Sequence, residues 1–449
     1  MRIDLHIGSN ILPTTIDIIG NILYNINHTK CLNENEVKIV LYFKDNVHFV
    51  KGYKNAAIYD NNKDKVYAIN DYGKEIIEKM LLGKVIESEI EQEYIDNLKK
   101  MEILTDKNNY AKQDFKIPKV KLIYAWLEIT EACNLKCIHC YGQFGYPKID
   151  KKEILTTQEW KGIIDRLINF GCRNIQLIGG EPMVHKDFYE ILEYAHKQGM
   201  KKIDVFTNAT LIDEKSIKIF KKTNANVRVS VYGHNAKVHE TITKQKGSFE
   251  NNKKGLELLK RNNVPTTIAV VLMKENEKYI DEIRKYIINL GHKYNGYDVI
   301  RPSCITEKKD HSITNVELLN SRYNTKPEFW TSKKAFLNNY FYNSCWNGKI
   351  AITSNGDVIP CIFARDEIIG NIKTETKKQL EEKVIQKWKM TKDCVEICRD
   401  CEFRYCCHDC RPLARAINGK INSKYPRCCY DPYKGIWENV KQCTKEIVE

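Results

Sequence analysis

The sequence predicts an α/β fold in which a partial barrel of six strand–helix units lies between two smaller regions. Two observations predict it. Short apolar runs alternate with amphipathic stretches between residues 121 and 305, which implies parallel strands joined by right-handed crossovers. Most of the 17 cysteines lie after residue 306, where the predicted elements are short. Six units do not complete an eight-unit barrel, so we expect an open, partial (β/α)6 barrel with its functional groups at the carboxyl ends of the strands.

The barrel units follow one another directly along the chain. Amphipathic stretches such as TQEWKGIIDRLINFG (157–171) and HKDFYEILEYAHKQGM (185–200) read as the helices between the strands. The predicted strands are IYAWLEI (123–129), NIQLIG (174–179), KIDVFTN (202–208), VRVSVYG (227–233), TTIAVVLM (266–273) and YDVIRP (297–302).

The region before the barrel predicts a small separate module. Residues 55–70 read as two strands around an Asn-Asn turn, and residues 71–83 and 87–104 read as two helices. This order suggests a winged-helix-like unit. A polar linker follows at 106–120. The expected domains are therefore 1–115, 116–305 and 306–449, and the last of these needs metal in place of a large apolar core.

Composition excludes several classes of protein. No run of 18 apolar residues is long enough to span a membrane, and the N-terminus has no secretory signal pattern, so we expect a cytoplasmic protein. In a reducing compartment 17 cysteines indicate metal ligation, redox chemistry or covalent catalysis, although isolated Cys31, Cys172 and Cys443 read as buried core residues. The net charge of +14 reads as a solvated lysine surface, with an acidic partner as the alternative.

Three cysteines follow the first barrel strand in a C-x3-C-x2-C spacing: Cys133, Cys137 and Cys140. Three thiolates on one tight loop can hold three irons of a [4Fe–4S] cluster and leave the fourth iron open for a chelating ligand. A structural zinc site would need a fourth ligand, usually as a second C-x2-C pair, and none occurs in the next hundred residues.

The segment CNLKCIHC resembles the signature of the radical S-adenosylmethionine (SAM) enzymes, and IGGEP at the end of the second strand resembles their segment for the amino group of SAM. The resemblance implies reductive cleavage of SAM to methionine and a 5′-deoxyadenosyl radical, which abstracts a hydrogen atom from substrate. Ordinary polar turn residues at the strand ends, or a histidine that only packs within the loop, would give the same sequence pattern as SAM-binding residues. The implied SAM-binding residues are Gly179, Gly180, Glu181 and Pro182 at the amino group, Asn208 and Ser230 at the ribose and carboxylate, and His139 near the adenine.

The cysteine-rich tail resembles the SPASM extension of these enzymes, which carries auxiliary [4Fe–4S] clusters. Cys345 and Cys361 frame a predicted hairpin with SNGD as its turn, in the family's C-x9–15-G-x4-C spacing. The next part, CRDCEFRYCCHDC (398–410), departs from the family pattern, because only two residues separate Cys407 from Cys410. A register through Cys406 keeps the final x3 spacing but shortens x5 to x4. We prefer the register through Cys407, which resembles a peptide-maturase variant of the family and leaves Cys406 as a core residue.

The resemblance then implies three [4Fe–4S] clusters. Cys428 is preferred to Cys429 because of its family-like spacing, and the fourth ligand of the first auxiliary cluster is either Cys304 or an open iron. A zinc ribbon made of two C-x2-C pairs is the competing interpretation of the tail. The implied ligands are Cys345, Cys361 and Cys410 for one auxiliary cluster, and Cys398, Cys401, Cys407 and Cys428 for the other.

From about residue 49 the N-terminal module weakly resembles the precursor-recognition element of peptide-modifying enzymes, which takes up a leader peptide as an added strand. The chain as a whole resembles radical SAM/SPASM maturases of ribosomally made peptides (RiPPs), such as thioether-forming sactisynthases and ranthipeptide maturases. This implies a precursor peptide as partner, an electron donor such as ferredoxin or flavodoxin, and a thioether cross-link from Cys as product. Carbon–carbon cross-linking, epimerisation or formylglycine formation in a sulfatase are alternatives, and a zinc-dependent nucleic-acid-binding protein is a remote one.

Overall fold

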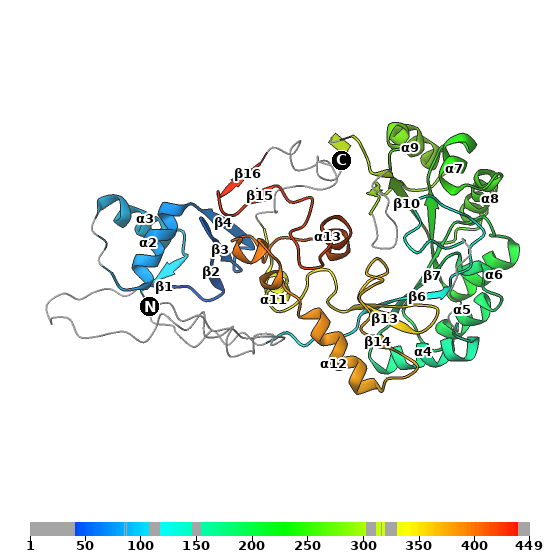
Figure 1. The fold of residues 1–449 in the computed structure, drawn as a ribbon, viewed down its shortest axis with the longest axis horizontal. Helices are drawn as coiled ribbons and strands as arrows, with labels where there is room; N and C mark the ends of the chain where they lie inside the picture. Colours follow the sequence, from blue (N-terminus) through cyan, green and yellow to red (C-terminus); the bar gives the residue numbers. More distant parts are fainter. Residues whose placement is uncertain are drawn as a thin grey trace.

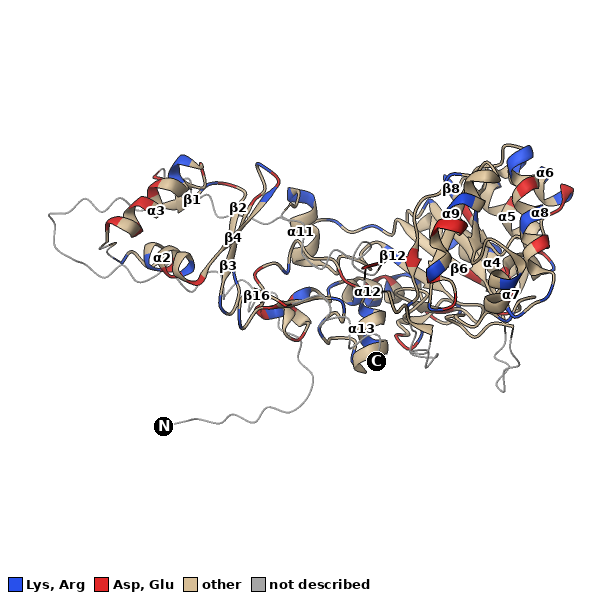
Figure 2. Ribbon diagram, turned by 90° about the horizontal axis from the view of Figure 1, so that it is seen from above, with Lys and Arg blue, Asp and Glu red and all other residues tan. Residues whose placement is uncertain are grey.

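The computed structural model describes residues 41–84, 86, 88–106, 117–145, 154–301, 311–315, 317–318 and 330–438. The molecule is elongated, and its three parts lie in a row (Figure 1). The N-terminal unit forms one end, the strand–helix part forms the other, and the cysteine-rich part lies between them (Figures 1 and 2). Parts that are far apart in the sequence are therefore neighbours in space.

Six parallel strands form the centre of the strand–helix part, which confirms the predicted fold class. They lie in the order β11-β10-β9-β8-β7-β6, so each strand pairs with the next one along the chain. The strands are β6 (Tyr124–Thr130), β7 (Asn174–Gly179), β8 (Lys202–Thr207), β9 (Asn226–Val231), β10 (Thr266–Leu272) and β11 (Asp298–Val299).

Helices cover the outer face of this sheet. Alternate strand residues, such as Leu127 and Leu177, share one apolar core with helix residues that include the fully buried Trp160. Caps mark where helices begin: Thr156 and Glu159 form a capping box at the first helix of the barrel. The helices are α4 (Thr157–Asn169), α5 (Phe188–Lys197), α6 (Glu214–Thr223), α7 (Ala236–Thr243), α8 (Ser248–Arg261) and α9 (Ile280–Asn289), with 3-10 turns η1 (Pro182–Val184) and η2 (Glu277–Tyr279).

The cysteine-rich part extends the same sheet. Strand β12 (Lys349–Ile352) pairs in parallel with β6, and β13 (Asp357–Ile359) and β14 (Gly370–Asn371) continue it as antiparallel strands. The predicted SNGD turn is confirmed between β12 and β13, where Gly356 has a φ of +88° that favours glycine. The sheet therefore crosses the domain boundary expected near residue 306.

The N-terminal unit contains a three-stranded antiparallel sheet in the order β2-β3-β4. The two predicted strands are present, and Val47–Lys51 adds a third that we did not predict. The elements are β1 (Tyr42–Phe43), β2 (Val47–Lys51), β3 (Ala56–Asp60), β4 (Lys65–Ile69), α2 (Asp71–Leu81), α3 (Glu89–Lys100) and β5 (Leu104–Thr105), which pairs with β1.

Strand β3 is buried on both faces. On one face Ala56 and Ile58 pack against the helices of the N-terminal unit. On the other, Ala57 and Tyr59 pack against the cysteine-rich part. The N-terminal unit is thus fixed to its neighbour through a common apolar core.

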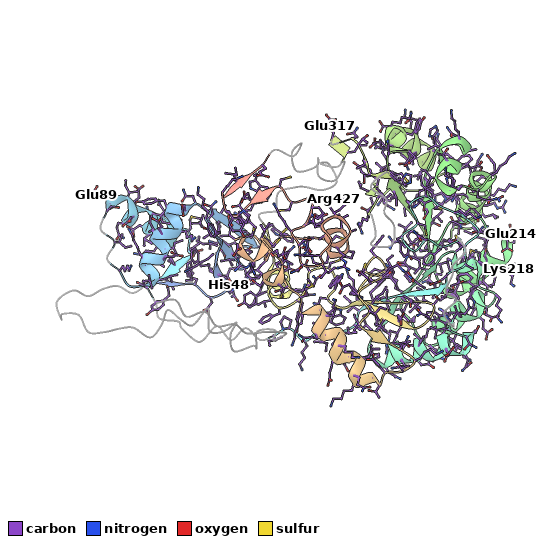
Figure 3. All side chains as sticks on the ribbon, viewed as in Figure 1. His48, Glu89, Glu214, Lys218, Glu317 and Arg427 are labelled. Carbon is purple, nitrogen blue, oxygen red and sulfur yellow. The ribbon has the colours of Figure 1, made fainter. Side chains whose placement is uncertain are left out.

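Aromatic contacts strengthen this junction. The ring of His48, which Figure 3 labels in the N-terminal unit, stacks on Phe336 at 4.5 Å between centroids. The Tyr59 hydroxyl donates to the Glu402 carbonyl oxygen at 2.8 Å.

The rest of the cysteine-rich part has short regular elements, as predicted. No helix in the part of the chain that the structure describes is long and apolar enough to cross a membrane. The remaining elements are α11 (Lys333–Phe341), α12 (Lys377–Trp388), η4 (Lys392–Cys394), η5 (Cys398–Asp400), α13 (Arg411–Asn418), β15 (Tyr430–Asp431) and β16 (Ile436–Trp437).

Candidate active site

The three-cysteine loop leaves β6 at its carboxyl end. Backbone N–H groups point at two of the sulfurs: Leu135 N lies 3.4 Å from Cys133 Sγ, and Phe144 N lies 3.3 Å from Cys140 Sγ. Burial raises the pKa of the Cys133 thiol to about 11. A thiolate at this position therefore needs a nearby cation to stabilise it. An iron ion bound to the sulfur would supply that positive charge.

Two glycines bring the end of β7 against this loop. A Cβ at Gly179 would lie 2.3 Å from the Thr130 carbonyl oxygen, and one at Gly180 would lie 2.3 Å from the Ala132 oxygen. Hydrogen bonds join the same backbones, from Gly180 N to Thr130 O and from Glu181 N to Ala132 O, both at 2.9 Å. The GGEP segment therefore contacts the cysteine loop directly, backbone to backbone.

Glu181 is buried behind these glycines, and Pro182 begins the turn η1. One carboxylate oxygen accepts from Thr207 Oγ1 at 2.7 Å and from Met183 N at 3.2 Å, and the other accepts from Asn208 N at 2.7 Å. Burial raises the pKa of Glu181 to about 7. The carboxylate thus holds the ends of β7 and β8 together, besides any contact with a ligand.

Asn208 and Ser230 lie at the ends of neighbouring strands. Asn252, which we did not predict from the sequence, joins these two strand ends. The buried Asn252 amide of α8 donates to the carbonyl oxygens of Asn208 at 2.9 Å and Ser230 at 3.1 Å. The Asn208 amide donates to Asn134 Oδ1 at 2.9 Å, within the cysteine loop. The expected SAM-binding residues are therefore brought together around that loop.

His139 packs against another residue that sequence reasoning missed. The rings of His139 and Tyr232 meet edge to face at 4.6 Å between centroids. Tyr232 is buried, and burial, followed by the charge of Cys137, raises its pKa well above the usual value. Its position in VSVYG, directly after a strand, was the available signal.

The cysteines of the first expected auxiliary site come together from three segments. Burial, and after it the charges of Cys345 and Cys410, raise the pKa of Cys361 to about 12, whereas Arg301 lowers it. Cys345 N donates to Asn343 Oδ1 at 3.0 Å, and Cys410 directly precedes α13. Cys304, the candidate fourth ligand, lies outside the described residues.

The second expected group, Cys398, Cys401, Cys407 and Cys428, also lies together. Burial and then Cys407 raise the pKa of Cys428 to about 11, and Cys407 and Cys428 both act on Cys401. Arg427, labelled in Figure 3, donates from Nη2 to the Ile300 carbonyl oxygen at 3.2 Å. This contact ties the segment that carries Cys428 to the end of β11.

Neighbouring cysteines have different surroundings. Cys406 is buried in the core shared with the N-terminal unit, where Tyr59 Oη lies 3.6 Å from its sulfur. Cys429 is also buried, and so is Cys172, as expected for core residues. Cys31 and Cys443 lie outside the described residues.

Three buried charged residues lie beside both auxiliary groups. Asp409 pairs with Lys392 at 2.7 Å and with Arg411 at 2.5 Å. Although burial opposes it, the two cations hold the pKa of Asp409 below its usual range. Two cations and one carboxylate leave a net positive charge close to the cysteines, which suits thiolates and an anionic cluster.

The donor set of each expected group fits an iron–sulfur cluster. All of its described members are cysteines, and thiolates are the usual ligands of such clusters. Within the ranges described, no group of three or more His, Cys, Asp or Glu side chains is placed to hold a single metal ion.

Comparison with known families agrees with this chemistry. Residues 127–287 match the Radical SAM superfamily, and residues 345–402 match SPASM, an iron–sulfur cluster-binding domain. The chain belongs to the radical SAM superfamily and is a radical SAM enzyme with an SPASM domain. This membership implies iron–sulfur clusters and SAM binding.

Several characterised proteins are similar to this chain. An AdoMet-dependent heme synthase of Methanosarcina barkeri is 26% identical over 344 residues, which cover 70% of this chain and 97% of that protein. The antilisterial bacteriocin subtilosin biosynthesis protein AlbA of Bacillus subtilis is 28% identical over 56% of this chain and 57% of its own length. The solved structure of anSMEcpe with bound AdoMet has a TM-score of 0.51 at 20% identity, covering 72% of this chain and 96% of that one, and supports the fold.

Proposed function

We propose that this radical SAM enzyme is a maturase that modifies a ribosomally made precursor peptide, with a thioether from a Cys of that peptide as the first choice of product. The observation that carries the proposal is the N-terminal sheet fixed to the cysteine-rich part through Tyr59 and Phe336. Similarity to AlbA, whose name connects it with a bacteriocin, supports a peptide substrate.

In the proposed site Cys133, Cys137 and Cys140 hold a [4Fe–4S] cluster whose open iron binds SAM, and bound SAM supplies a 5′-deoxyadenosyl radical on one-electron reduction. Gly179, Gly180 and Pro182 bring backbone groups close to the amino end of SAM. Glu181 holds the strand ends in register. Asn208 and Ser230 would contact the ribose and carboxylate of SAM, and His139 would lie near the adenine.

Cys345, Cys361 and Cys410 would hold one auxiliary cluster, with Cys304 or an open iron completing it. Cys398, Cys401, Cys407 and Cys428 would hold the other. The buried cation Lys392 favours thiolates in both groups by charge, and Arg411 favours them in the second group. Because this part lies between the N-terminal unit and the strand–helix part, a peptide held by the former passes the auxiliary groups before it reaches SAM (Figure 1).

The electron balance defines what the protein must provide. A C–H bond and the S–H bond of Cys are broken, and a C–S bond forms. One hydrogen atom goes to the 5′-deoxyadenosyl radical to give 5′-deoxyadenosine, and the thiol releases a proton. One electron enters from a donor such as ferredoxin or flavodoxin to cleave SAM, and one must leave when the C–S bond closes. Clusters held by the auxiliary cysteines would supply an acceptor for it.

The N-terminal unit is proposed to bind the leader of the peptide as an added strand of its β2-β3-β4 sheet. A role as a folding appendage is the alternative. Carbon–carbon cross-linking, epimerisation or formylglycine formation would use the same radical and stay alternative reactions on a peptide.

A heme-synthase-type reaction on a tetrapyrrole is the second candidate, because that relative is matched over 97% of its length. The same match leaves 30% of this chain without a counterpart.

The test uses anaerobically purified full-length protein. We expect about twelve irons per chain for three four-iron clusters, and 5′-deoxyadenosine after addition of dithionite and SAM. With a cysteine-rich peptide encoded near its gene, we expect a product lighter by the mass of two hydrogen atoms per thioether. Iron-free protein that holds zinc and cleaves no SAM contradicts the proposal. Conversion of an iron tetrapyrrole, with no change of any peptide, supports the second candidate.

Deletion of residues 1–110 tests the N-terminal unit. Peptide binding should weaken more than peptide-independent SAM cleavage. That cleavage is the control for folding, because the deletion uncovers Phe336 and Tyr405. Equal loss of both activities would assign the unit a structural role.

A further inference from the structure

Arg365 connects the cysteine-rich part with the strand–helix part at the level of the first cysteine loop. It lies four residues after Cys361, one of the expected auxiliary ligands. Its Nη1 donates to both carboxylate oxygens of Glu128 on β6, at 2.7 and 2.8 Å. The side chain of Arg365 is 10% exposed and that of Glu128 is fully buried.

Glu128 is anchored from a second side by the cysteine loop itself. Tyr141, the residue after Cys140, donates its hydroxyl to Glu128 Oε1 at 3.0 Å. Removal of either donor would leave a buried carboxylate with too few partners, which is costly in an apolar interior. The carboxylate of Glu128 therefore binds both the cysteine loop, through Tyr141, and Arg365.

The guanidinium also lies over the rings of that loop. Its central carbon is 5.9 Å from the Tyr141 ring centroid and 5.3 Å from that of Phe144. Phe144 is buried, and its N–H points at Cys140 Sγ. A Cβ at Gly142 would lie 2.3 Å from the Phe144 ring. The loop is thus folded tightly around an aromatic ring that Arg365 covers.

We infer that Arg365 is a positioning residue: through Glu128, Tyr141 and Phe144, the segment that carries Cys361 fixes the loop that carries Cys140. Correct folding around the first auxiliary group is then required for the correct geometry of the SAM-binding group. This inference deepens the proposed function and rests on it, since it takes both cysteine groups as cluster ligands.

The test compares Arg365→Met with Arg166→Met as a matched control. Arg166 also joins the strand–helix part to the cysteine-rich part, donating to the Ile372 carbonyl oxygen and to the Glu375 oxygen at 2.9 Å, but it contacts no part of the cysteine loop in the described structure. Iron content, SAM affinity and the electron paramagnetic resonance spectrum of the first cluster with SAM are measured for both anaerobic proteins.

For Arg365→Met we expect unchanged iron, SAM binding at least tenfold weaker and an altered or heterogeneous spectrum of the SAM-bound first cluster. Arg166→Met should match the wild type in SAM affinity and in the spectrum. Wild-type SAM affinity and spectrum in Arg365→Met would overturn the inference. Failure of the wild-type protein itself to bind iron and cleave SAM would instead overturn the proposed function.

Two milder variants keep the test informative if Arg365→Met folds poorly. Tyr141→Phe removes only the hydroxyl and should shift the spectrum with a smaller loss of SAM affinity. Arg365→Lys keeps the charge but loses the two-oxygen contact, and should recover part of the SAM affinity. If both of these variants match the wild type in spectrum and in SAM affinity, the positioning role is contradicted.

Discussion

The two cysteine regions of this molecule are built in different ways. Cys133, Cys137 and Cys140 lie on one loop, which packs against glycine backbones, an amide network, the rings of His139 and Tyr232, and the Arg365–Glu128 pair. The auxiliary cysteines come from segments between residues 345 and 428, and buried Lys392, Asp409 and Arg411 lie beside them. A local loop can be recognised from spacing alone, whereas a site assembled from distant segments depends on the whole fold.

The largest expected effect is in the first region. Cys133→Ala should abolish 5′-deoxyadenosine formation and remove about four of about twelve irons, because only two of the three thiolates that would hold the cluster are left. Iron analysis and product chromatography check this. Cys394→Ala, at an exposed cysteine outside both expected auxiliary groups, is the control and should keep both properties. Unchanged SAM cleavage in Cys133→Ala would refute the assignment of the loop.

The adjacent residues Cys406 and Cys407 provide a sharper comparison within the second region. Cys407→Ala should lose iron and peptide turnover while peptide-independent SAM cleavage continues. Cys406→Ala should keep its iron and lose about 1 kcal/mol of unfolding free energy, because the sulfur loses its contacts with Tyr59 Oη and the Phe403 carbonyl oxygen. Iron analysis and thermal unfolding of the two variants decide the register, and the opposite pattern would move the ligand to Cys406.

The buried ion pairs of Asp409 with Lys392 and Arg411 lie beside the cysteines of the second region, and Lys392→Met tests their effect. Asp409 would keep only Arg411 as a partner, so we expect the free energy of unfolding to fall by about 2 kcal/mol. The reduction potential of the auxiliary clusters should also fall, since a nearby cation stabilises the reduced, more negative state. Redox titration measures this, and Lys383→Met at an exposed ion pair serves as control. An unchanged reduction potential in Lys392→Met would show that the charge of Lys392 does not act on the auxiliary clusters.

The packing beside the first region should respond to mild acid. Burial lowers the pKa of His239, which packs between Tyr232 and Phe249, to about 4, against a usual 6.5. The unfolded chain therefore binds a proton that the folded chain does not, and stability is complete above pH 6.5 and falls as the pH drops toward 4. Between pH 7 and 5 the loss should be about 2 kcal/mol. Denaturant unfolding at both pH values should show less pH dependence in His239→Phe.

The sequence allowed the six parallel strands to be predicted because each is a short apolar run that ends in polar residues. The cysteine groups were predicted from spacing and resemblance, and the structure places the proposed members of each group together. Strand β2 was missed because its apolar residues do not alternate regularly with polar ones.

The residues around the cysteines were harder to predict, since their partners are remote in sequence. Asn252, Tyr232 and Arg365 are ordinary residues until the fold sets them beside Asn208, His139 and Glu128. Tyr232 gave a signal by its place directly after a strand, and Glu128 gave one as a carboxylate inside the apolar run IYAWLEI, where burial requires a partner.

Strand β3 belongs to two cores at once, so the N-terminal unit is fixed to its neighbour and does not hang on a tether. If this unit holds the leader as proposed, an extended peptide would cover a constant span, at roughly 3.3 Å per residue, before it arrives at the strand ends. The architecture then works as a ruler. It would select the residue to be modified by counting from the anchored end, and inserting residues between anchor and target should shift the site of modification by the same number.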